Sequence, residues 1–384
     1  MGIVPVSARV LQWRAAWSSD PVKRLRLLQR ARASPARSAR WWPLVAIPIV
    51  LASATALLQP AFRRAGAPQS QPRAAPHLIA PPHSSPKPDA LPGRVWLVEA
   101  TDRFELFSNG LQVENQFQTS TQPRAYLCLP RDSMETSPAR LRFDPAGIVF
   151  HTTESHMAPF EEEQNGTLRR AGEGLLEFVR RNHSYHFVID RFGRVFRVVR
   201  EGDYANHAGH SVWADQSWIY INLNQSFIGV AFEATSRPGD GPPVNPAQVH
   251  AGRILVEMLR ARYKIPAVNC VTHAQVSINP TNRRAGYHTD WAANLPFHDL
   301  GLSDNYLRPL PSVALFGFTA DGLGTGDALG PALEAAEDLI RRDAAAHGMP
   351  PQRYREILQR RYKDAIASVG RSNMGRPNNV KYQY

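Results

Sequence analysis

Strand and helix patterns alternate between residues 144 and 300, and this alternation limits the possible fold more than any other feature of the chain. Apolar runs at residues 147–151 and 227–232 predict buried strands. Asn245 and Pro246 are residue types preferred at an N-cap and at the first helical position, so they predict the start of a long helix. We therefore expect an α/β domain over residues 144–300, in which helices flank a central mixed β-sheet.

The segments on either side of this domain have weaker patterns. Residues 93–143 contain several short strand patterns and predict a small β accessory segment packed on the main domain. Residues 301–384 contain two helical patterns and predict a C-terminal extension with two helices. On this evidence the extension either packs on the core or forms a separate helical appendage.

Positive charge is concentrated at the N-terminus. The formal net charge is +12, and residues 1–92 hold 13 Lys and Arg against two acids, whereas residues 93–384 are close to neutral. A near-neutral folded part argues against a nucleic-acid groove, so we expect no nucleic-acid partner. Only two Cys are present, which excludes a disulfide-dense scaffold and a multi-cysteine zinc module. The pattern does not specify an oligomeric state.

The first 92 residues predict a membrane tether. Residues 1–40 form a basic leader, residues 41–62 lack charged side chains and are long enough to span a bilayer, and residues 63–92 form a Pro-rich linker. Because the positive charge precedes the span, we expect the leader in the cytoplasm and the folded part on the periplasmic side of the cell membrane. The alternatives are a cleaved signal peptide, which would release the protein, and a buried core helix.

Two histidines end predicted strands, His151 after one apolar run and His273 after another. Ligands at the ends of neighbouring strands can converge on one ion, and a catalytic zinc site needs three protein ligands and an open position. Residues 287–291 offer His288 and Asp290, which project to one side of an extended chain. No helical HExxH pair is present, which excludes the common helix-based metalloprotease site.

Six motifs in this chain resemble, in their order, the zinc-dependent N-acetylmuramoyl-L-alanine amidases, a family that includes the peptidoglycan recognition proteins and phage lysozyme-like amidases. The resemblance covers residues 145–298, roughly the predicted α/β domain, and implies the fold of that family. The motifs are GIVFHTTES (147–155), SYHFVIDRFGRVF (184–196), ANHAGHS (205–211), QSFIGVAFEA (225–234), VTHAQVS (271–277) and HTDW (288–291).

The resemblance assigns roles by position. It implies that Tyr185 lines the site and assists acid–base steps, and that His288 occupies a position where many members carry Lys. The expected Zn²⁺ ligands are His151, His273 and Asp290. The residues expected to line the substrate cleft are Thr152, Asn206 and His207.

The chain also departs from the family pattern. The interval of 17 residues between His273 and Asp290 is longer than in most members, which implies an insertion near residues 278–286. Some bacterial members carry a catalytic Glu at the position of Ala231, whereas the nearest acid here is Glu233. Positions 231 and 233 face the same side of a strand, so Glu233 is a candidate for the catalytic carboxylate. The alternative is that Glu233 is a salt-bridge partner or an acid of a loop.

The function implied by the resemblance is zinc-dependent hydrolysis of the amide between N-acetylmuramic acid and L-alanine, with peptidoglycan or a muropeptide as substrate. If a protonated His288 stabilises the oxyanion, the rate should fall as the pH rises through the pKa of His288. Two alternatives stay open: a non-catalytic peptidoglycan-binding module, and a zinc amide hydrolase that acts on another peptide.

Overall fold

The computed structural model describes residues 89–131, 139–155, 157–235, 244–318 and 329–373, all within the unit Ala80–Tyr384. The predicted basic leader, the predicted membrane span and most of the Pro-rich linker lie outside the described residues. The membrane tether therefore stays a prediction. Among the described residues, no helix combines the length and the apolar character that crossing a membrane requires.

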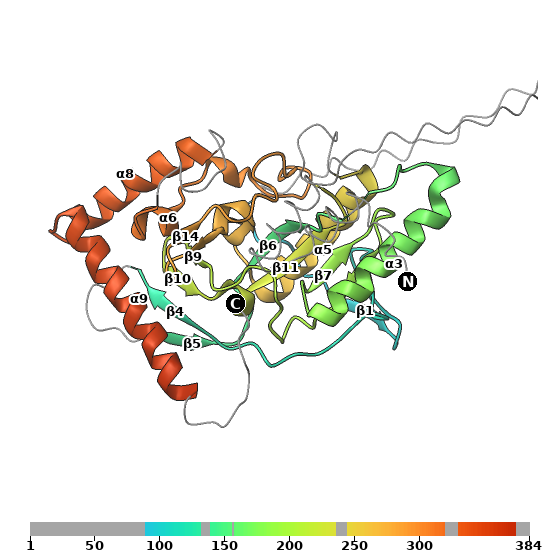
Figure 1. Ribbon diagram of the computed structural model, residues 1–384, viewed down its shortest axis with the longest axis horizontal. Coiled ribbons are helices and arrows are strands. Elements are labelled where there is room, and N and C mark those ends of the chain that lie inside the picture. The colour runs from blue at the N-terminus through green and yellow to red at the C-terminus, as the bar shows by residue number, and fades with distance from the viewer. Residues whose placement is uncertain (1–88, 132–138, 156, 236–243, 319–328, 374–384) are drawn as a thin grey trace, which may run out of the picture. The chain divides into compact units, whose positions relative to one another are not determined.

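The predicted central mixed sheet is present (Figure 1), and it extends beyond the predicted domain. Its strands are β1 (Leu97–Ala100), β2 (Phe104–Phe107), β3 (Gln112–Glu114), β6 (Gly147–Thr152), β7 (Phe187–Ile189), β8 (Val195–Arg197), β11 (Phe227–Phe232) and β12 (Cys270–Thr272). Their order across the sheet is β1-β2-β3-β8-β7-β11-β6-β12. Strand β6 pairs in parallel with both β11 and β12, and β11 pairs in parallel with β7. The carboxyl ends of these four strands therefore lie along one edge of the sheet.

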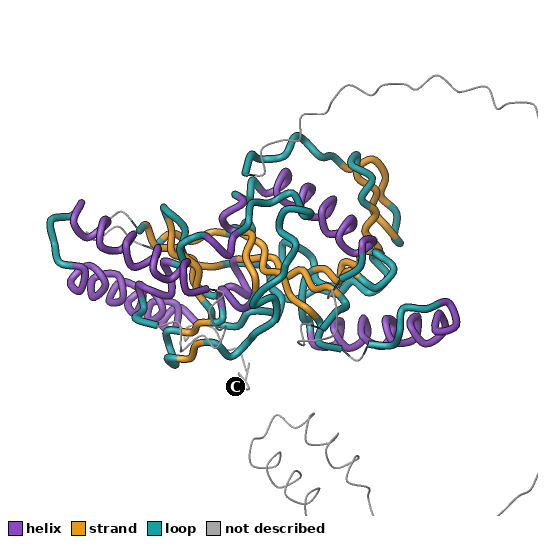
Figure 2. Tube along the Cα trace, turned by 90° about the horizontal axis from the view of Figure 1, so that it is seen from above, coloured by secondary structure: helices purple, strands orange, loops and turns teal. Residues whose placement is uncertain are grey.

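Helices cover both faces of this sheet (Figure 2). Helix α5 (Pro246–Tyr263) begins where the sequence predicts, because the side chains of Asn245 and Gln248 each accept a hydrogen bond from the other residue's backbone N–H. Its apolar side chains pack on one face, and those of α3 (Asn165–Asn182) pack on the other. Fully buried strands such as β6 and β11 follow from this two-sided cover.

A second sheet contains only antiparallel pairs, and it has the order β5-β4-β10-β9. Its strands are β4 (Tyr126–Pro130), β5 (Arg140–Arg142), β9 (Val212–Ala214) and β10 (Trp218–Ile221). Apolar side chains of three further helices complete its core: α6 (Pro311–Leu315), α8 (Gly330–Ala346) and α9 (Pro351–Asn373). An ion pair between Arg131 and Asp343 joins the end of β4 to α8. The C-terminal extension thus packs on the core and is not a separate appendage.

The predicted β accessory segment at residues 93–143 is not a separate unit in the structure. Strands β1–β3 extend the central sheet, because β3 pairs in parallel with β8, and β4 and β5 belong to the second sheet. Strands of three to five residues are not stable alone, so they take their hydrogen bonds from neighbours that are distant in the sequence.

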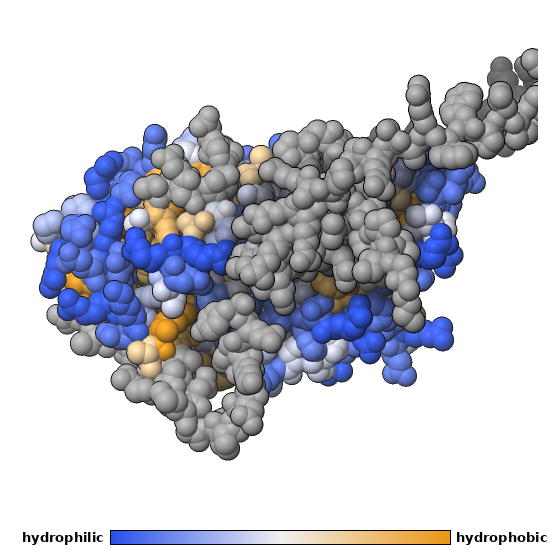
Figure 3. Space-filling view, in the orientation of Figure 1, coloured by the Kyte–Doolittle hydropathy of each residue, from blue (hydrophilic) through white to orange (hydrophobic). Residues whose placement is uncertain are grey.

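The remaining elements are short. They are α4 (Leu223–Ser226), the hairpin β13 (Ile278–Asn279) with β14 (Arg284–Ala285), and the 3-10 turns η1 (Glu162–Gln164), η2 (Ala267–Asn269), η3 (Ala274–Val276) and η4 (Asn305–Leu307). The hairpin lies where the long interval between His273 and Asp290 predicts an insertion. On the face shown in Figure 3, the described surface is mostly hydrophilic and its hydrophobic patches are small.

Candidate metal centre and substrate site

The three predicted ligands meet at the carboxyl edge of the central sheet. His151 lies near the end of β6, and His273 directly follows the neighbouring strand β12. The backbone N–H of His273 donates to the carbonyl oxygen of Phe150 (3.1 Å), which fixes the two ligands side by side. Asp290 comes from the segment after the β13–β14 hairpin, and its carbonyl oxygen accepts from the N–H of Ala274 (3.2 Å).

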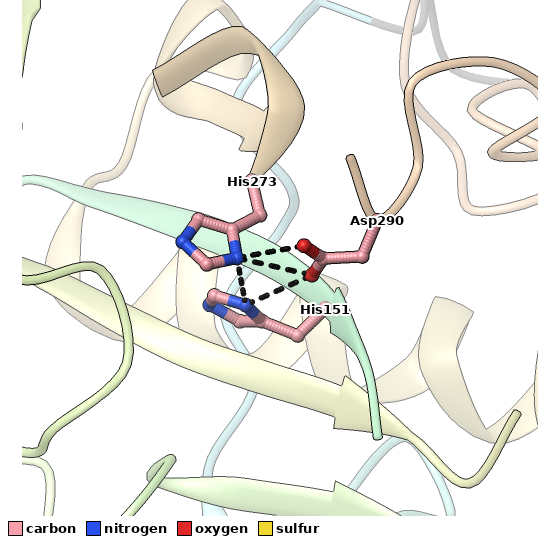
Figure 4. A group of neighbouring side chains, drawn as sticks. All are labelled: His151, His273 and Asp290. Carbon is pink, nitrogen blue, oxygen red and sulfur yellow. Dashed lines mark hydrogen bonds and ion pairs between the residues drawn. The ribbon is translucent and has the colours of Figure 1, made fainter. Parts of the chain in front are cut away.

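The distances between the ligand atoms are those of a compact metal site (Figure 4). The Nδ1 atoms of His151 and His273 lie 3.1 Å apart. Asp290 Oδ1 is 2.8 Å from His273 Nδ1, and Asp290 Oδ2 is 3.3 Å from His151 Nδ1. With metal–ligand bonds of 2.0–2.1 Å, neighbouring ligands of a tetrahedral zinc ion are about 3.3 Å apart.

The donor chemistry also fits zinc. Two imidazole nitrogens and one carboxylate oxygen all lie within 4.8 Å of one another, and all three residues are buried. Two unprotonated nitrogens at this separation repel each other unless a proton or a cation lies between them. Catalytic zinc sites have three protein ligands and keep the fourth position for water or substrate. His151, His273 and Asp290 would therefore hold the ion.

Electrostatics keep this ligand set in its metal-binding protonation state. Burial alone would raise the pKa of Asp290, but the charges of His273 and His151 and their hydrogen bonds outweigh burial and lower it. Burial, followed by the charge of His273, lowers the pKa of His151 from 6.5 to about 4. Near neutral pH the site thus offers a carboxylate and a neutral imidazole, the forms that bind a metal.

Acidification should destabilise the metal-free protein. Unfolded His151 gains a proton below about pH 6.5, whereas folded His151 does so only near pH 4. The stabilisation is therefore complete above the unfolded pKa and is lost as the pH falls between these values, by about 3 kcal/mol. Urea unfolding at about pH 7, 5.5 and 4 measures this loss. His151→Asn is the control, because Asn does not titrate, and an equally steep loss in that variant would contradict the assignment.

Tyr185 and His288 flank the ligands as predicted. The Tyr185 ring lies 4.9 Å from the His151 ring, with a backbone φ of 58° in the left-handed region. Burial, then the charges of Asp290 and Glu154, raise the pKa of Tyr185, so its hydroxyl keeps its proton. His288 stacks on His273 with ring centroids 4.0 Å apart.

The protonation expected for His288 is corrected by this environment. Partial burial, then the charge of His273, lower the pKa of His288, so the ring is neutral near pH 7. A neutral imidazole does not supply the cation that Lys supplies in other members. The predicted fall in rate follows the pKa of His288, so a lowered pKa moves it to a more acidic pH.

Glu233 lies away from the three ligands. It is buried, and its carboxylate accepts a hydrogen bond from the backbone N–H of Arg191 in the β7–β8 turn (3.2 Å). Ala231 is the strand partner of His151. Glu233 directly follows β11, two residues or about 6.6 Å beyond Ala231. Burial raises the pKa of Glu233, and the charges acting on it are those of Asp190, Arg191 and Arg194. The structure thus gives Glu233 a role in the turn and does not bring it to the metal ligands.

The three residues predicted for the cleft wall have different surroundings. Thr152 is buried, and its hydroxyl donates to Glu154 (2.5 Å). Asn206 is exposed and donates to the carbonyl oxygen of Asn182 at the end of α3 (3.1 Å). His207 is only 8% exposed and lies behind His151, with Nδ1 3.1 Å from His151 Nε2. The structure thus places His207 against a predicted metal ligand, and its role in the cleft wall stays a prediction.

The sequence analysis missed Glu154, a carboxylate near Tyr185. Glu154 follows β6 with a φ of 49°, and its two oxygens accept from the hydroxyls of Thr152 and Thr235. Its charge contributes to the raised pKa of Tyr185. The sequence did offer a signal, because Glu154 is an acid only three residues after the predicted ligand His151.

Comparison with known proteins gives one family match. The family model described as N-acetylmuramoyl-L-alanine amidase matches residues 142–290. No curated protein matches the chain.

Several solved structures are similar to part of this chain. AmpDH3 from Pseudomonas aeruginosa, in complex with anhydromuramic pentapeptide, is 22% identical over 44% of this chain and 63% of its own, with a TM-score of 0.30. The amidase LysC from Clostridium intestinale is 20% identical over 49% of this chain and 93% of its own, with a TM-score of 0.28. The amidase AmiD from E. coli, in complex with anhydro-N-acetylmuramic acid-L-Ala-D-gamma-Glu-L-Lys, is 21% identical over 45% of this chain and 69% of its own, with a TM-score of 0.31. This chain thus spans less than two thirds of the AmpDH3 chain in that complex.

Proposed function

We propose that this chain, whose residues 142–290 match the N-acetylmuramoyl-L-alanine amidase family model, hydrolyses the amide bond between N-acetylmuramic acid and L-alanine. The substrate would be peptidoglycan or a muropeptide, and the reaction would use zinc. The observation that carries the proposal is the convergence of His151, His273 and Asp290 at the edge of the central sheet. Two imidazoles and a carboxylate with an open fourth position are a ligand set of hydrolytic zinc enzymes.

When bound, zinc supplies a Lewis acid that polarises the amide carbonyl and lowers the pKa of water. The side chains of this protein supply the rest of the chemistry. Tyr185 keeps its proton and lies beside His151, so its hydroxyl can donate a hydrogen bond to the oxyanion that develops on the carbonyl oxygen.

The proton for the leaving amine requires a second group near the ligands. His288 is neutral and stacks on His273, so a ring nitrogen can accept a proton and pass it to the amine of L-alanine. Glu154 is a carboxylate near Tyr185, and its charge, together with that of Asp290, raises the pKa of Tyr185. Tyr185 thus lies beside one histidine ligand, and His288 lies beside the other.

Product identification tests this proposal. The purified full chain, supplied with zinc, is incubated with peptidoglycan, and the soluble products are analysed by mass spectrometry. We expect stem peptides with a free amino group on L-alanine and glycans with a free lactyl carboxylate. Cleavage elsewhere in the peptide would instead indicate a zinc amide hydrolase of other specificity. Binding without products would indicate a peptidoglycan-binding module.

We also propose that the protein acts outside the cytoplasmic membrane, where its polymeric substrate lies. The support is the uncharged stretch at residues 41–62, preceded by a basic leader and followed by a Pro-rich linker. Alkaline extraction of membranes from cells that express the full chain tests this placement, because release of the intact chain into the soluble fraction would contradict an anchor.

A further inference from the structure

A buried imidazole, that of His207, contacts the metal ligand His151 on the side opposite the other two ligands. His207 Nδ1 lies 3.1 Å from His151 Nε2, and the two rings meet edge to face with centroids 5.2 Å apart. The other nitrogen of His151, Nδ1, faces His273 and Asp290. His207 therefore forms a hydrogen bond with Nε2 of His151, the nitrogen that does not face the other ligands.

Hydrogen bonding leaves His207 only one tautomer. The carbonyl oxygen of Phe227 lies 3.3 Å from His207 Nε2, and because a carbonyl oxygen only accepts, Nε2 carries the proton. With its proton on Nε2, the buried ring presents an unprotonated Nδ1 to His151 as an acceptor. The donor to that acceptor is the Nε2–H of His151. With its proton on Nε2, His151 presents an unprotonated Nδ1 to the other ligands.

The backbone around His207 fixes the position of its ring. The side-chain oxygen of Asn224 accepts hydrogen bonds from the N–H groups of His207 (2.8 Å), Ala208 (2.7 Å) and Gly209 (2.8 Å). Across the ring, strand β11 passes so close that a Cβ on Gly229 would lie 2.6 Å from His207 Cγ. The ring is thus confined between a loop held by Asn224 and a strand that needs glycine at this point.

A buried cation holds the carbonyl oxygen that determines this tautomer. Arg124 is 1% exposed. Its Nη1 donates to the backbone carbonyl oxygen of Phe227 (3.1 Å), and its Nε donates to the backbone carbonyl oxygen of Glu201 (3.0 Å). The Phe227 oxygen therefore accepts from both His207 and Arg124. Two donors on one buried carbonyl keep it turned towards the imidazole.

His273 has no equivalent support, because its Nε2 is buried without a hydrogen-bond partner in the described part of the chain. We infer that His207 is a positioning residue for the metal site: its Nδ1 accepts from His151 Nε2–H and so holds His151 in the tautomer that leaves Nδ1 free for zinc. This inference rests on the zinc dependence proposed above. Residues that orient a ligating histidine in this way typically change metal affinity 10- to 100-fold when they are replaced.

Three substitutions in the purified full chain test this role. His207→Leu removes the acceptor, His207→Gln places an amide near the Phe227 oxygen but not near His151, and His207→Asn keeps an oxygen close to the position of Nδ1. Zn²⁺ affinity is measured by competition with a chromophoric chelator. We expect binding about 10- to 100-fold weaker in the Leu and Gln variants and less than about 10-fold weaker in the Asn variant.

Thermal unfolding of each variant without metal separates a structural effect from positioning. If His207→Leu is unfolded without metal, the Zn²⁺ affinities of His207→Asn and His207→Gln are compared instead. Both new side chains are polar, and only Asn keeps an acceptor near His151. Equal Zn²⁺ affinity in the folded variants and the original protein would overturn the inference. Because no substrate is present, a failure to hydrolyse peptidoglycan would overturn the proposed function and leave the role of His207 standing.

Discussion

Replacement of His273 by Ala should abolish zinc binding and lower amide hydrolysis at least about 1,000-fold. The loss of a single oxyanion donor already costs 10²–10³ in rate, and this change removes the Lewis acid that activates both water and carbonyl. His273 Nδ1 also lies closest to the carboxylate, 2.8 Å from Asp290 Oδ1, so its removal leaves a buried acid with one partner fewer. Metal content after dialysis and the rate of stem-peptide release measure the two effects.

His298→Ala is the matched control, because the side chain of His298 is 93% exposed and lies outside the ligand set. This variant and the original protein should lose activity with a chelator and regain it with added zinc, whereas His273→Ala should not respond to either. Full zinc content and activity in His273→Ala would contradict the assignment of His273 as a zinc ligand.

Replacement of Tyr185 by Phe should lower kcat about 100-fold and leave zinc content and KM close to their original values. The phenol ring packs against His151, and Phe preserves this packing. The substitution removes only the hydroxyl. In the original protein this hydroxyl keeps its proton, because burial and the charges of Asp290 and Glu154 raise the pKa of Tyr185. A donor that acts on the developing oxyanion contributes to the transition state and not to substrate binding, so kcat changes and KM does not.

Tyr263→Phe provides the control for this change, since Tyr263 is half-buried at the end of α5 and packs in the core on one face of the sheet. Its kinetics should match those of the original protein. If Tyr185→Phe loses zinc together with activity, the hydroxyl supports the ligand set, and its assignment as an oxyanion donor is wrong.

Features encoded by neighbouring residues could be predicted from the sequence. Strand β11 and helix α5 occur at the predicted residues, because an uninterrupted apolar run and an N-cap followed by Pro are local signals. The metal ligands were predictable for a related reason. His151 and His273 end two apolar strands, and parallel neighbours bring such ends together.

Features that depend on contacts between distant residues were missed. Strands β9 and β10 have only three and four residues, too few for a periodic pattern, and they exist because β4 pairs with β10. The same limit applies to the prediction for Glu233. Strand alternation predicts that Glu233 and Ala231 face the same side of the sheet, but it does not predict how far Glu233 lies from His151. For His207, the sequence gives the residue type but not the burial that determines its partner.

The packing of α8 and α9 on the second sheet has a consequence for which part of the chain is an independent folding unit. Their apolar side chains share one core with β4, which precedes the family-matched segment, and with β10, which lies inside it. A protein cut to residues 142–290 would expose that core on two sides. We therefore expect residues 142–290 alone to be less stable than the same segment with both flanking regions.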